Sequence, residues 1–342
     1  MHGEPVRKPP GAIVLRPHWQ CSINRDGTRR SCNCCDGSPQ SAPLPHGIAS
    51  THSSCVKQPA QRLFFALAPR ENYRVCGSDA QDAYAHSPPP ETPTFVSIDN
   101  THADWCEHRF KKKSDHSLVL PVLHVLQGHP ESGKLWEKHV TAILRLPQFR
   151  FKSTTHDRST CSPTFEDTRT LLLRQVDNFA VACPDEDIAK RLHDQIGKAL
   201  QLPSENAPPF KCLGLVNDFN GLDIAQCSDA IKLSCEKHID RVLTAHGWSK
   251  PSPPVPSKPS APLPVDAVAS LRAHQGPPEN TAEHVALVAK HGFACRALLG
   301  KLLCAHVACR PDVGYTTIAL SKFSTCPHDH HFAVPKKVAK CL

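Results

Sequence analysis

The stretch that most constrains the fold is residues 171–183, LLLRQVDNFAVAC. Two apolar runs, residues 171–176 and 179–183, flank the pair Asp177-Asn178, and this pattern predicts a β-hairpin with a two-residue turn. Asn and Asp tolerate the positive φ that a tight hairpin turn requires. The hairpin therefore places a carboxylate, that of Asp177, at an exposed tip.

A second acidic site lies upstream in residues 77–84, GSDAQDAY, which contain Asp79 and Asp82. Two separated acidic sites, one of them on a hairpin tip, can hold divalent metal ions for phosphoryl chemistry. Simpler interpretations stay open for each residue. Asp82 suits a loop or a helix cap, Tyr84 suits a core, and Asp177 alone would be an ordinary turn residue.

The bulk composition limits the classes of protein to consider. The 342 residues are enough for roughly two to three domains. A formal net charge of +8 suits a polyanionic partner. The sequence shows no N-terminal apolar segment and no long apolar span, so we expect an intracellular protein, cytoplasmic or nuclear, that does not cross a membrane. In that setting the 17 cysteines are expected to be free thiols.

Two groups of Cys and His could in principle hold zinc. The spacing of the first group fits no standard zinc pattern, and Cys304 in the second shares a helical face with leucines, which favours core thiols. Zinc stays the alternative for both. The groups are Cys21, Cys32, Cys34 and Cys35, and Cys304, His306, Cys309, Cys326, His328, His330 and His331.

Residues 128–135, GHPESGKL, match most of the phosphate-binding loop pattern G-x-x-x-x-G-K-[ST]. The matching positions are Gly128, Gly133 and Lys134. Leu135 stands where a hydroxyl should bind Mg²⁺, and Pro130 removes one backbone donor. A loop that enters a helix is therefore favoured, and a P-loop nucleotide-binding protein is the less favoured alternative.

Composition and periodicity divide the chain. The acidic residues 185–187 open a segment in which Ile188, Leu192, Ile196 and Leu200 recur at helical spacing, which predicts an amphipathic helix packed on a sheet. The proline-rich residues 249–264 predict a semi-rigid linker, and a basic run, residues 109–113, is either solvated surface or a contact for phosphates. The predicted domains are an N-terminal, fingers-like segment (1–75), a palm-like domain (76–248), a linker (249–280) and a helical connection segment (281–342).

Taken together, these segments resemble the reverse transcriptase of copia-type retrotransposons. The sequence DAQDAY of residues 79–84 is similar to the first polymerase carboxylate motif, and LQGHPESGKLW of residues 126–136 is similar to the family's Gln-Gly to Leu-Trp segment. The sequence QVDN of residues 175–178 stands where the family has Tyr-Val-Asp-Asp. Leu213-Gly214 resembles the primer-gripping hairpin, and residues 296–323 resemble the segment that leads into an RNase H domain.

The resemblance implies an α+β, right-hand polymerase fold with fingers and palm, an antiparallel palm sheet packed on helices, and a helical C-terminal segment. It implies RNA-directed DNA synthesis by nucleotidyl transfer with two Mg²⁺ ions, on an RNA or DNA template with primer and with dNTP. The implied site residues are Asp79, Asp177 and Asn178 for catalysis, Asp79 and Asp177 for metal, Tyr84 and Gln127 for the nucleotide, and Leu213 and Gly214 for the primer.

Asn178 is the main departure from the family pattern, because an amide binds a hard cation less well than a carboxylate does. We therefore expect a reverse transcriptase domain that is impaired or inactive, a degenerate copy. The alternative is a non-catalytic, nucleic-acid-binding remnant of a transposable element.

Overall fold

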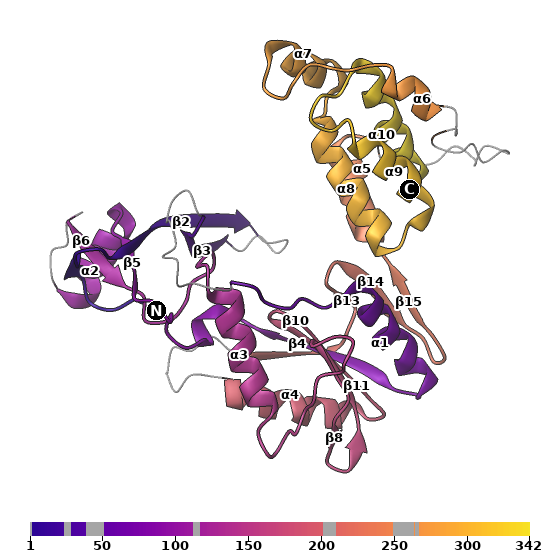
Figure 1. The fold of residues 1–342 in the computed structure, drawn as a ribbon. Coiled ribbons are helices and arrows are strands. Elements are labelled where there is room, and N and C mark those ends of the chain that lie inside the picture. The colour runs from indigo at the N-terminus through magenta and orange to yellow at the C-terminus, as the bar shows by residue number, and fades with distance from the viewer. Residues whose placement is uncertain are drawn as a thin grey trace. The chain divides into compact units, whose positions relative to one another are not determined.

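The computed structural model describes residues 2–23, 29–38, 51–111, 117–200, 210–248, 263 and 267–342. The chain divides into two compact units, Met1–Val216 and Asn217–Leu342. Within the described residues the fold is mixed, with ten α-helices and four sheets (Figure 1). None of the described helices has both the length and the apolar character needed to cross a membrane.

The first sheet of the N-terminal unit has the strand order β1-β6-β5-β2-β3. Its strands are β1 (Val6–Arg7), β2 (Ile13–Ile23), β3 (Arg29–Asp36), β5 (Thr94–Ser97) and β6 (Leu118–Pro121). The long strand β2 pairs in parallel with β5 and antiparallel with β3, so β2 and β3 form a ribbon that extends from the sheet. Helix α2 (Asn100–Phe110) follows β5.

The second sheet of this unit is antiparallel throughout and has the order β12-β4-β11-β10-β7. Its strands are β4 (Arg74–Ala80), β7 (Thr160–Cys161), β10 (Leu171–Gln175), β11 (Asn178–Cys183) and β12 (Phe210–Leu215). A separate small hairpin joins β8 (Thr164–Phe165) to β9 (Thr168–Arg169). The second sheet contains both acidic segments that the sequence singled out.

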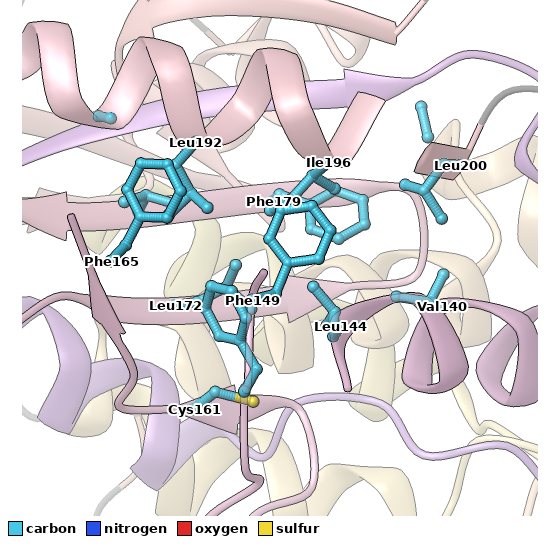
Figure 2. Packing of buried hydrophobic residues seen from close by; sticks show 14 of the residues in the cluster. Val140, Leu144, Phe149, Cys161, Phe165, Leu172, Phe179, Leu192, Ile196 and Leu200 are labelled. Atoms are coloured by element: carbon cyan, nitrogen blue, oxygen red, sulfur yellow. The ribbon is translucent and has the colours of Figure 1, made fainter. Parts of the chain in front are cut away.

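One face of the second sheet packs against α3 (Ser132–Leu144) and α4 (Glu186–Leu200). Phe179, Val181 and Leu172 on the strands are fully buried against these helices. Figure 2 shows Ile196 of α4 close to Phe179 and Leu192 of the same helix close to Phe165. Burial of each large apolar side chain contributes about 1.5–3 kcal/mol. The amphipathic helix predicted from the stripe between Ile188 and Leu200 is confirmed.

The other face of the second sheet is apolar along most of its length. Val75, Leu173 and Ala180 have no exposed surface there, and α1 (Gln58–Arg70) contacts both β4 and β10. The short helix η1 (Ala83–His86) follows β4. This face stops being apolar only at its last row, where Asp79 and Asn178 lie opposite each other.

The C-terminal unit combines the three-stranded sheet β13-β14-β15 with helices. The strands are β13 (Asp218–Phe219), β14 (Leu222–Gln226) and β15 (Ile231–Ser234), and the helices are α5 (Glu236–Ala245), α6 (Ala267–Arg272), α7 (Ala282–His291), α8 (Cys295–Ala308), η2 (Pro311–Val313), α9 (Gly314–Ser321) and α10 (Asp329–Cys341). Its core includes Phe293, Leu298, Leu302 and Phe332. The helical character that the sequence predicted for this segment is present.

The proline-rich linker predicted over residues 249–280 lies partly outside the described residues, which omit 249–262 and 264–266. Its remainder contains α6. The division at residue 216 is coarser than the four predicted segments, and the predicted boundaries stay predictions.

Candidate active site

The hairpin predicted over residues 171–183 is present, but its turn lies one residue earlier than expected. Gln175 pairs with Asn178, so the two turn residues are Val176 and Asp177, and Asn178 is the first residue of β11. Val176 has a φ of 53°. A β-branched residue is rarely found at positive φ, because its side chain crowds the backbone there. The prediction was wrong because it assigned the turn by the residue types that tolerate this conformation.

Contacts from distant parts of the chain hold this turn in place. The indole nitrogen Nε1 of Trp136, on α3, donates a 2.7 Å hydrogen bond to the carbonyl oxygen of Val176. The backbone amide of Ala80 donates to the carbonyl oxygen of Asp177 at 2.9 Å. The core helix α3 and the end of β4 therefore fix the hairpin tip, and the strain at Val176 is offset by tertiary bonds.

Sheet register places a row of polar side chains beside the tip. Asn178 pairs with Gln175 on one side and with Asp79 on the other, and Asp79 pairs with Lys211 of β12. Residues that face each other in adjacent antiparallel strands project from the same face of the sheet. Lys211, Asp79, Asn178 and Gln175 therefore form one row across four strands.

Two side chains of this row, those of Asn178 and Gln175, are engaged in hydrogen bonds. The amide nitrogen Nδ2 of Asn178 donates to Oδ1 of Asp177 at 2.9 Å. Oε1 of Gln175 accepts from the backbone amide of Val56 at 2.9 Å. The structure thus brings the three predicted catalytic positions together, with an amide N–H directed at one of the two carboxylates.

The donor set limits what cations the site could hold. Mg²⁺ prefers several oxygen ligands in near-octahedral geometry, and a pair of ions would concentrate four positive charges on two carboxylates, Asp79 and Asp177. Among the residues that the structure describes, no three His, Cys, Asp or Glu side chains are grouped so that they could hold a metal ion. Two carboxylates and an amide are too few anionic ligands for a pair of such ions. Magnesium binding itself stays a prediction, as does zinc at the Cys and His groups.

The two predicted nucleotide-binding residues line one pocket of about 140 Å³. Tyr84 lies on η1, and Gln127 is held by its carbonyl oxygen, which accepts from the amide of Cys35 on β3 at 2.8 Å. Burial raises the pKa of Tyr84, and the charge of Asp177 raises it further. The phenol is therefore within electrostatic reach of the hairpin tip.

The pocket also contains residues that the sequence did not assign to it. Ser31, Cys32 and Asn33 of β3 line it together with Asp82. Lys211, opposite Asp79, was likewise not foreseen. These positions depend on which strands pair and in which register, and no local pattern in the sequence reports that.

The predicted primer-contact residues lie in β12, an outer strand of the described second sheet. The pairing of β12 with β4 shifts register between Cys212 and Gly214, which forms a bulge at Leu213. The Leu213 side chain is 59% exposed, and Gly214 has a φ of 71°, which suits glycine. These residues are accessible, and their role stays a prediction.

The P-loop alternative requires backbone amides that are free to cradle phosphate. In the segment 128–135, the amide of His129 donates to the carbonyl oxygen of Leu126, that of Glu131 to the His129 ring, and that of Ser132 to the carbonyl oxygen of His129. These amides are already engaged within the loop. The segment is the entry to α3, as the favoured interpretation expected.

The lysine of the P-loop pattern is engaged as well. Nζ of Lys134 lies 2.8 Å from the carboxylate of Glu91, which also accepts from Lys138. These two lysines lower the pKa of Glu91 to about 2. Gly128, with a φ of 90°, lies against the carbonyl oxygen of Cys35, where any Cβ would collide. Close packing against β3 therefore accounts for a glycine at position 128, and phosphate binding is not needed to explain it.

Comparisons with known proteins return only distant likenesses. No protein-family model matches the chain, and no curated protein matches it. A solved structure of the foamy viral protease-reverse transcriptase in complex with dsDNA is similar at 12% identity over 99% of this chain and 53% of that chain, with a TM-score of 0.39.

Two further solved structures are similar at the same level. A dRH form of the foamy viral protease-reverse transcriptase with dsDNA matches at 11% identity over 98% of this chain and 44% of that chain, with a TM-score of 0.36. Telomerase from Candida albicans, in complex with a fragment of telomeric RNA, matches at 10% identity over 71% of this chain and 52% of that chain, with a TM-score of 0.31. The chain spans about half the length of the chains it matches. Function has to be argued from the residues of the site.

Proposed function

We propose that this chain is a reverse-transcriptase-like polymerase domain of the copia type whose DNA synthesis is impaired. The observation that carries the proposal is the arrangement of Asp79, Asp177 and Asn178: Asp79 pairs with Asn178 across adjacent strands, and Asp177 is the turn residue beside Asn178. These are the three positions at which the sequence motifs resemble the polymerase carboxylates. The amide at one of them accounts for the expected loss of activity.

The pocket beside the tip supports the same proposal. Tyr84 and Gln127 come from separate sequence motifs, yet they line one cavity that lies within electrostatic reach of Asp177. In the proposed function the incoming nucleotide would contact both residues. The primer would lie along β12, where Leu213 and Gly214 are accessible, and Lys211 would meet a backbone phosphate.

Primer extension on an RNA template, with Mg²⁺ and separately with Mn²⁺, tests this proposal. The unaltered chain is expected to give negligible product, and Asn178→Asp is expected to raise the rate at least about a hundredfold, since each ~1.4 kcal/mol of barrier is tenfold in rate. The double variant Asn178→Asp with Asp79→Asn is the matched control and should lose the gain. Robust extension by the unaltered chain would contradict the impairment.

A second candidate function is non-catalytic binding of nucleic acid, which Lys211 favours because it places a cation beside Asp79. It predicts salt-dependent binding of template–primer, with no synthesis by either the unaltered chain or Asn178→Asp. Extension by Asn178→Asp separates an impaired polymerase from this candidate. A chain that binds no template–primer at low salt would exclude both.

A further inference from the structure

A small cavity lies where α3 meets the helix-covered face of the second sheet. Its volume is about 10 Å³, which is room for about one water molecule. Three arginines line it: Arg145 at the C-terminal end of α3, Arg158, and Arg174 of β10. Among the described residues, no aspartate or glutamate lines it. Its apolar lining includes Leu144, Cys161 and Leu172, which are drawn in Figure 2.

The most buried of the three cations is Arg174, which is only 4% exposed. Its guanidinium group forms no hydrogen bond and no ion pair with any residue that the structure describes. Burial lowers the pKa of this group, but an arginine stays protonated in proteins. A buried cation is costly to the folded state unless an acceptor compensates it. The cavity therefore contains a positive charge whose hydrogen-bond donors are unused.

Two carboxylates lie near enough to act on Arg174 through their charge, those of Glu137 and Asp157. Both oxygens of Asp157 already accept from backbone amides, at 2.8 Å and 2.9 Å. Oε2 of Glu137 accepts from another backbone amide at 2.8 Å. Cys161 is a neutral thiol, because burial raises its pKa. Two negative charges thus stand against three arginines, and the surroundings of the cavity stay positive.

The hydroxyl of Ser159 is a second, independent indication of a ligand. Ser159 lines the cavity and is buried, and its Oγ has no hydrogen-bond partner among the described residues. Its backbone is fixed, because its amide donates to Asp157 at 2.8 Å and its carbonyl oxygen accepts from the amide of Arg174 at 2.9 Å. Buried hydroxyl groups are nearly always hydrogen-bonded, so an unpaired one beside an unpaired guanidinium indicates a bound polar species.

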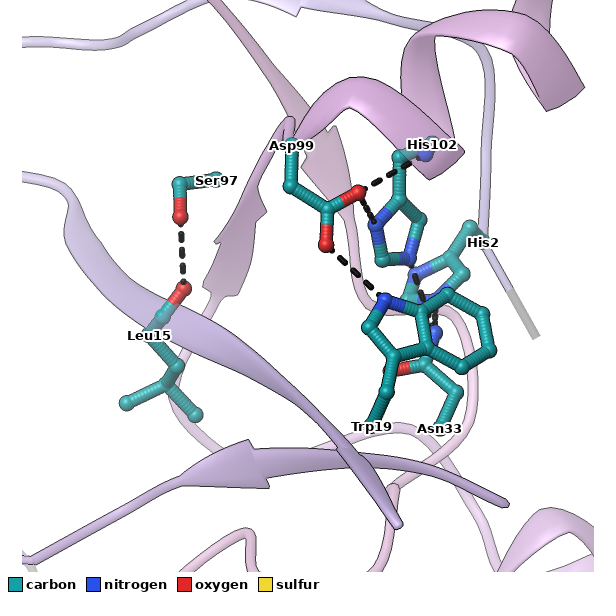
Figure 3. Close-up of polar contacts among 7 residues, drawn as sticks. All are labelled: His2, Leu15, Trp19, Asn33, Ser97, Asp99 and His102. Atoms are coloured by element: carbon teal, nitrogen blue, oxygen red, sulfur yellow. Dashed lines mark hydrogen bonds and ion pairs between the residues drawn. The ribbon is translucent and has the colours of Figure 1, made fainter. Parts of the chain in front are cut away.

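Another buried polar cluster of the same unit shows the usual arrangement, in which the chain satisfies its own groups. Nδ1 of the buried His102 lies 2.8 Å from Oδ1 of Asp99, and its Nε2 lies 2.8 Å from Nδ2 of Asn33 (Figure 3). Oδ2 of Asp99 accepts from the indole nitrogen of Trp19 at 2.9 Å. Arg174 has no comparable acceptor in the described part of the chain, so an external anion would supply it.

Size and donor geometry define the class of anion. The cavity is too small for a whole phosphate group, so only one atom of such a ligand could enter it. Arg145 and Arg158 are exposed, so they can meet the atoms that stay outside. Guanidinium groups bind oxyanions with paired N–H donors. A monatomic anion would fill the cavity but leave the two outer arginines without a partner.

We propose that Arg145, Arg158 and Arg174 form a binding site for a small oxyanion, either inorganic phosphate or the terminal phosphate of a phosphomonoester. Arg174 pairs with Phe179, so the site lies on the face of the second sheet opposite the row of Asp79 and Asn178. It is therefore separate from the candidate active site and does not depend on the proposed polymerase function.

Calorimetric titration and thermal unfolding with phosphate, at constant ionic strength, test the site. The unaltered chain is expected to bind inorganic phosphate with a Kd of about 1 mM or below. Its melting temperature should rise by about 3 °C at ten times the Kd. Thymidine monophosphate and thymidine distinguish the two sources of phosphate. Binding of the monophosphate but not of thymidine would extend the site to phosphomonoesters, and binding of inorganic phosphate alone would restrict it to the free ion.

Substitutions separate anion binding from a structural role. Arg174→Met keeps the length of the side chain and should abolish the response to phosphate. Without phosphate its melting temperature should stay the same or rise, because an apolar side chain replaces a buried, unpaired charge. Arg145→Gln and Arg158→Gln should each weaken phosphate binding about tenfold. Arg169→Gln, at an exposed arginine that does not line the cavity, is the matched control and should bind phosphate as the unaltered chain does.

Three results would overturn the site. They are no response of the unaltered chain to phosphate, an equal response in Arg174→Met, and a response to chloride as large as that to phosphate. If Arg174→Met does not fold, the double variant of Arg145→Gln with Arg158→Gln decides, and phosphate affinity equal to that of Arg169→Gln would then overturn the site. Primer extension by Asn178→Asp is measured separately, so the failure of one proposal is distinguishable from the failure of the other.

Discussion

The two faces of the second sheet are built from the same strands but are constrained differently. On the face under α3 and α4, Phe179 and Val181 lie in the apolar core, and Arg174 and Ser78, which pair with Phe179, are buried there as well. On the opposite face the apolar surface stops one row short of the end, where Asp79 and Asn178 begin. Neighbouring residues in one strand therefore serve different purposes: Phe179 supports the fold, and Asn178 belongs to the candidate site.

This difference explains why the hairpin can keep its shape while its chemistry changes. Helices hold the turn from the apolar face, through Trp136 and the core. The polar row contributes little burial, so an amide can replace a carboxylate there without loss of the fold. Substitutions on the two faces should consequently have separable effects on stability and on activity.

The largest effect is expected on the apolar face. Phe179→Ala should lower the free energy of unfolding by about 3–5 kcal/mol, because a fully buried ring is replaced by a cavity. Urea unfolding followed by circular dichroism measures this change. Lys211→Ala, on the polar row, is the matched control and should stay within about 0.5 kcal/mol. Equal losses in both variants would remove the distinction between the faces.

The next effect depends on pH and also comes from the helix-covered face. His193 of α4 is fully buried, and burial lowers its pKa from 6.5 to about 4. The unfolded chain therefore binds more protons than the folded chain between these values. The contribution of His193 to the free energy of unfolding is consequently complete above pH 6.5 and is lost as the pH drops toward 4. The loss from this residue is up to about 3 kcal/mol.

A variant isolates this contribution. His193→Gln should show a flatter dependence of unfolding free energy on pH between about 4 and 6.5, measured by urea unfolding at several pH values. His330→Gln, at an exposed histidine of the other unit, is the control and should keep the original slope. An unchanged slope in His193→Gln would show that this ring is not held neutral in the core.

An intermediate effect links the two faces. Trp136→Phe keeps an aromatic ring in the core but removes the N–H that bonds the Val176 carbonyl. An unpaired carbonyl and a smaller ring should cost about 2 kcal/mol. Thermal unfolding gives the loss, with Phe149→Leu as a core substitution that breaks no bond to the turn. Faster hydrogen exchange at the turn in the Trp136 variant alone would support the link, and equal exchange would contradict it.

The smallest effect on stability is expected at the polar row. Asn178→Asp should destabilise the fold by less than about 1 kcal/mol, because it adds a carboxylate beside Asp177 and Asp79. Mg²⁺ should raise the melting temperature of this variant more than that of the unaltered chain, since an ion that binds the folded state stabilises it. Asn178→Ser removes the amide without adding charge and should show no added response. Equal responses to Mg²⁺ in all three proteins would contradict a cation site here.

Periodic patterns predicted the main elements well, and tertiary contacts account for what they missed. The apolar runs around the hairpin and the stripe on α4 are local, so the sequence reveals them. The turn shifted by one residue because Trp136, forty residues upstream, holds Val176 in a conformation that its residue type disfavours. A rule based on neighbouring residues cannot predict a hydrogen bond between residues so far apart in the sequence.

The candidate site was predictable only in part for the same reason. The resemblance supplied Asp79 and Asp177, and the structure places Asp79 near the end of β4 and Asp177 in the adjoining hairpin turn, whose carbonyl oxygen accepts from Ala80. Lys211 depends on the register of β12 against β4, and the contribution of Asn33 to the pocket depends on how the ribbon packs near Tyr84. Register and packing between distant segments are properties of the whole fold.

The bulge at Leu213 has a consequence for the behaviour of the protein at high concentration. An outer strand with exposed leucines offers backbone groups to which a second molecule could add a strand, which is a common route to aggregation. The bulge and Gly214 interrupt the regular spacing of those groups within the six residues of β12. A second molecule therefore cannot form a straight, continuous ladder of hydrogen bonds along β12. We expect this to limit aggregation at the strand where the primer is proposed to lie.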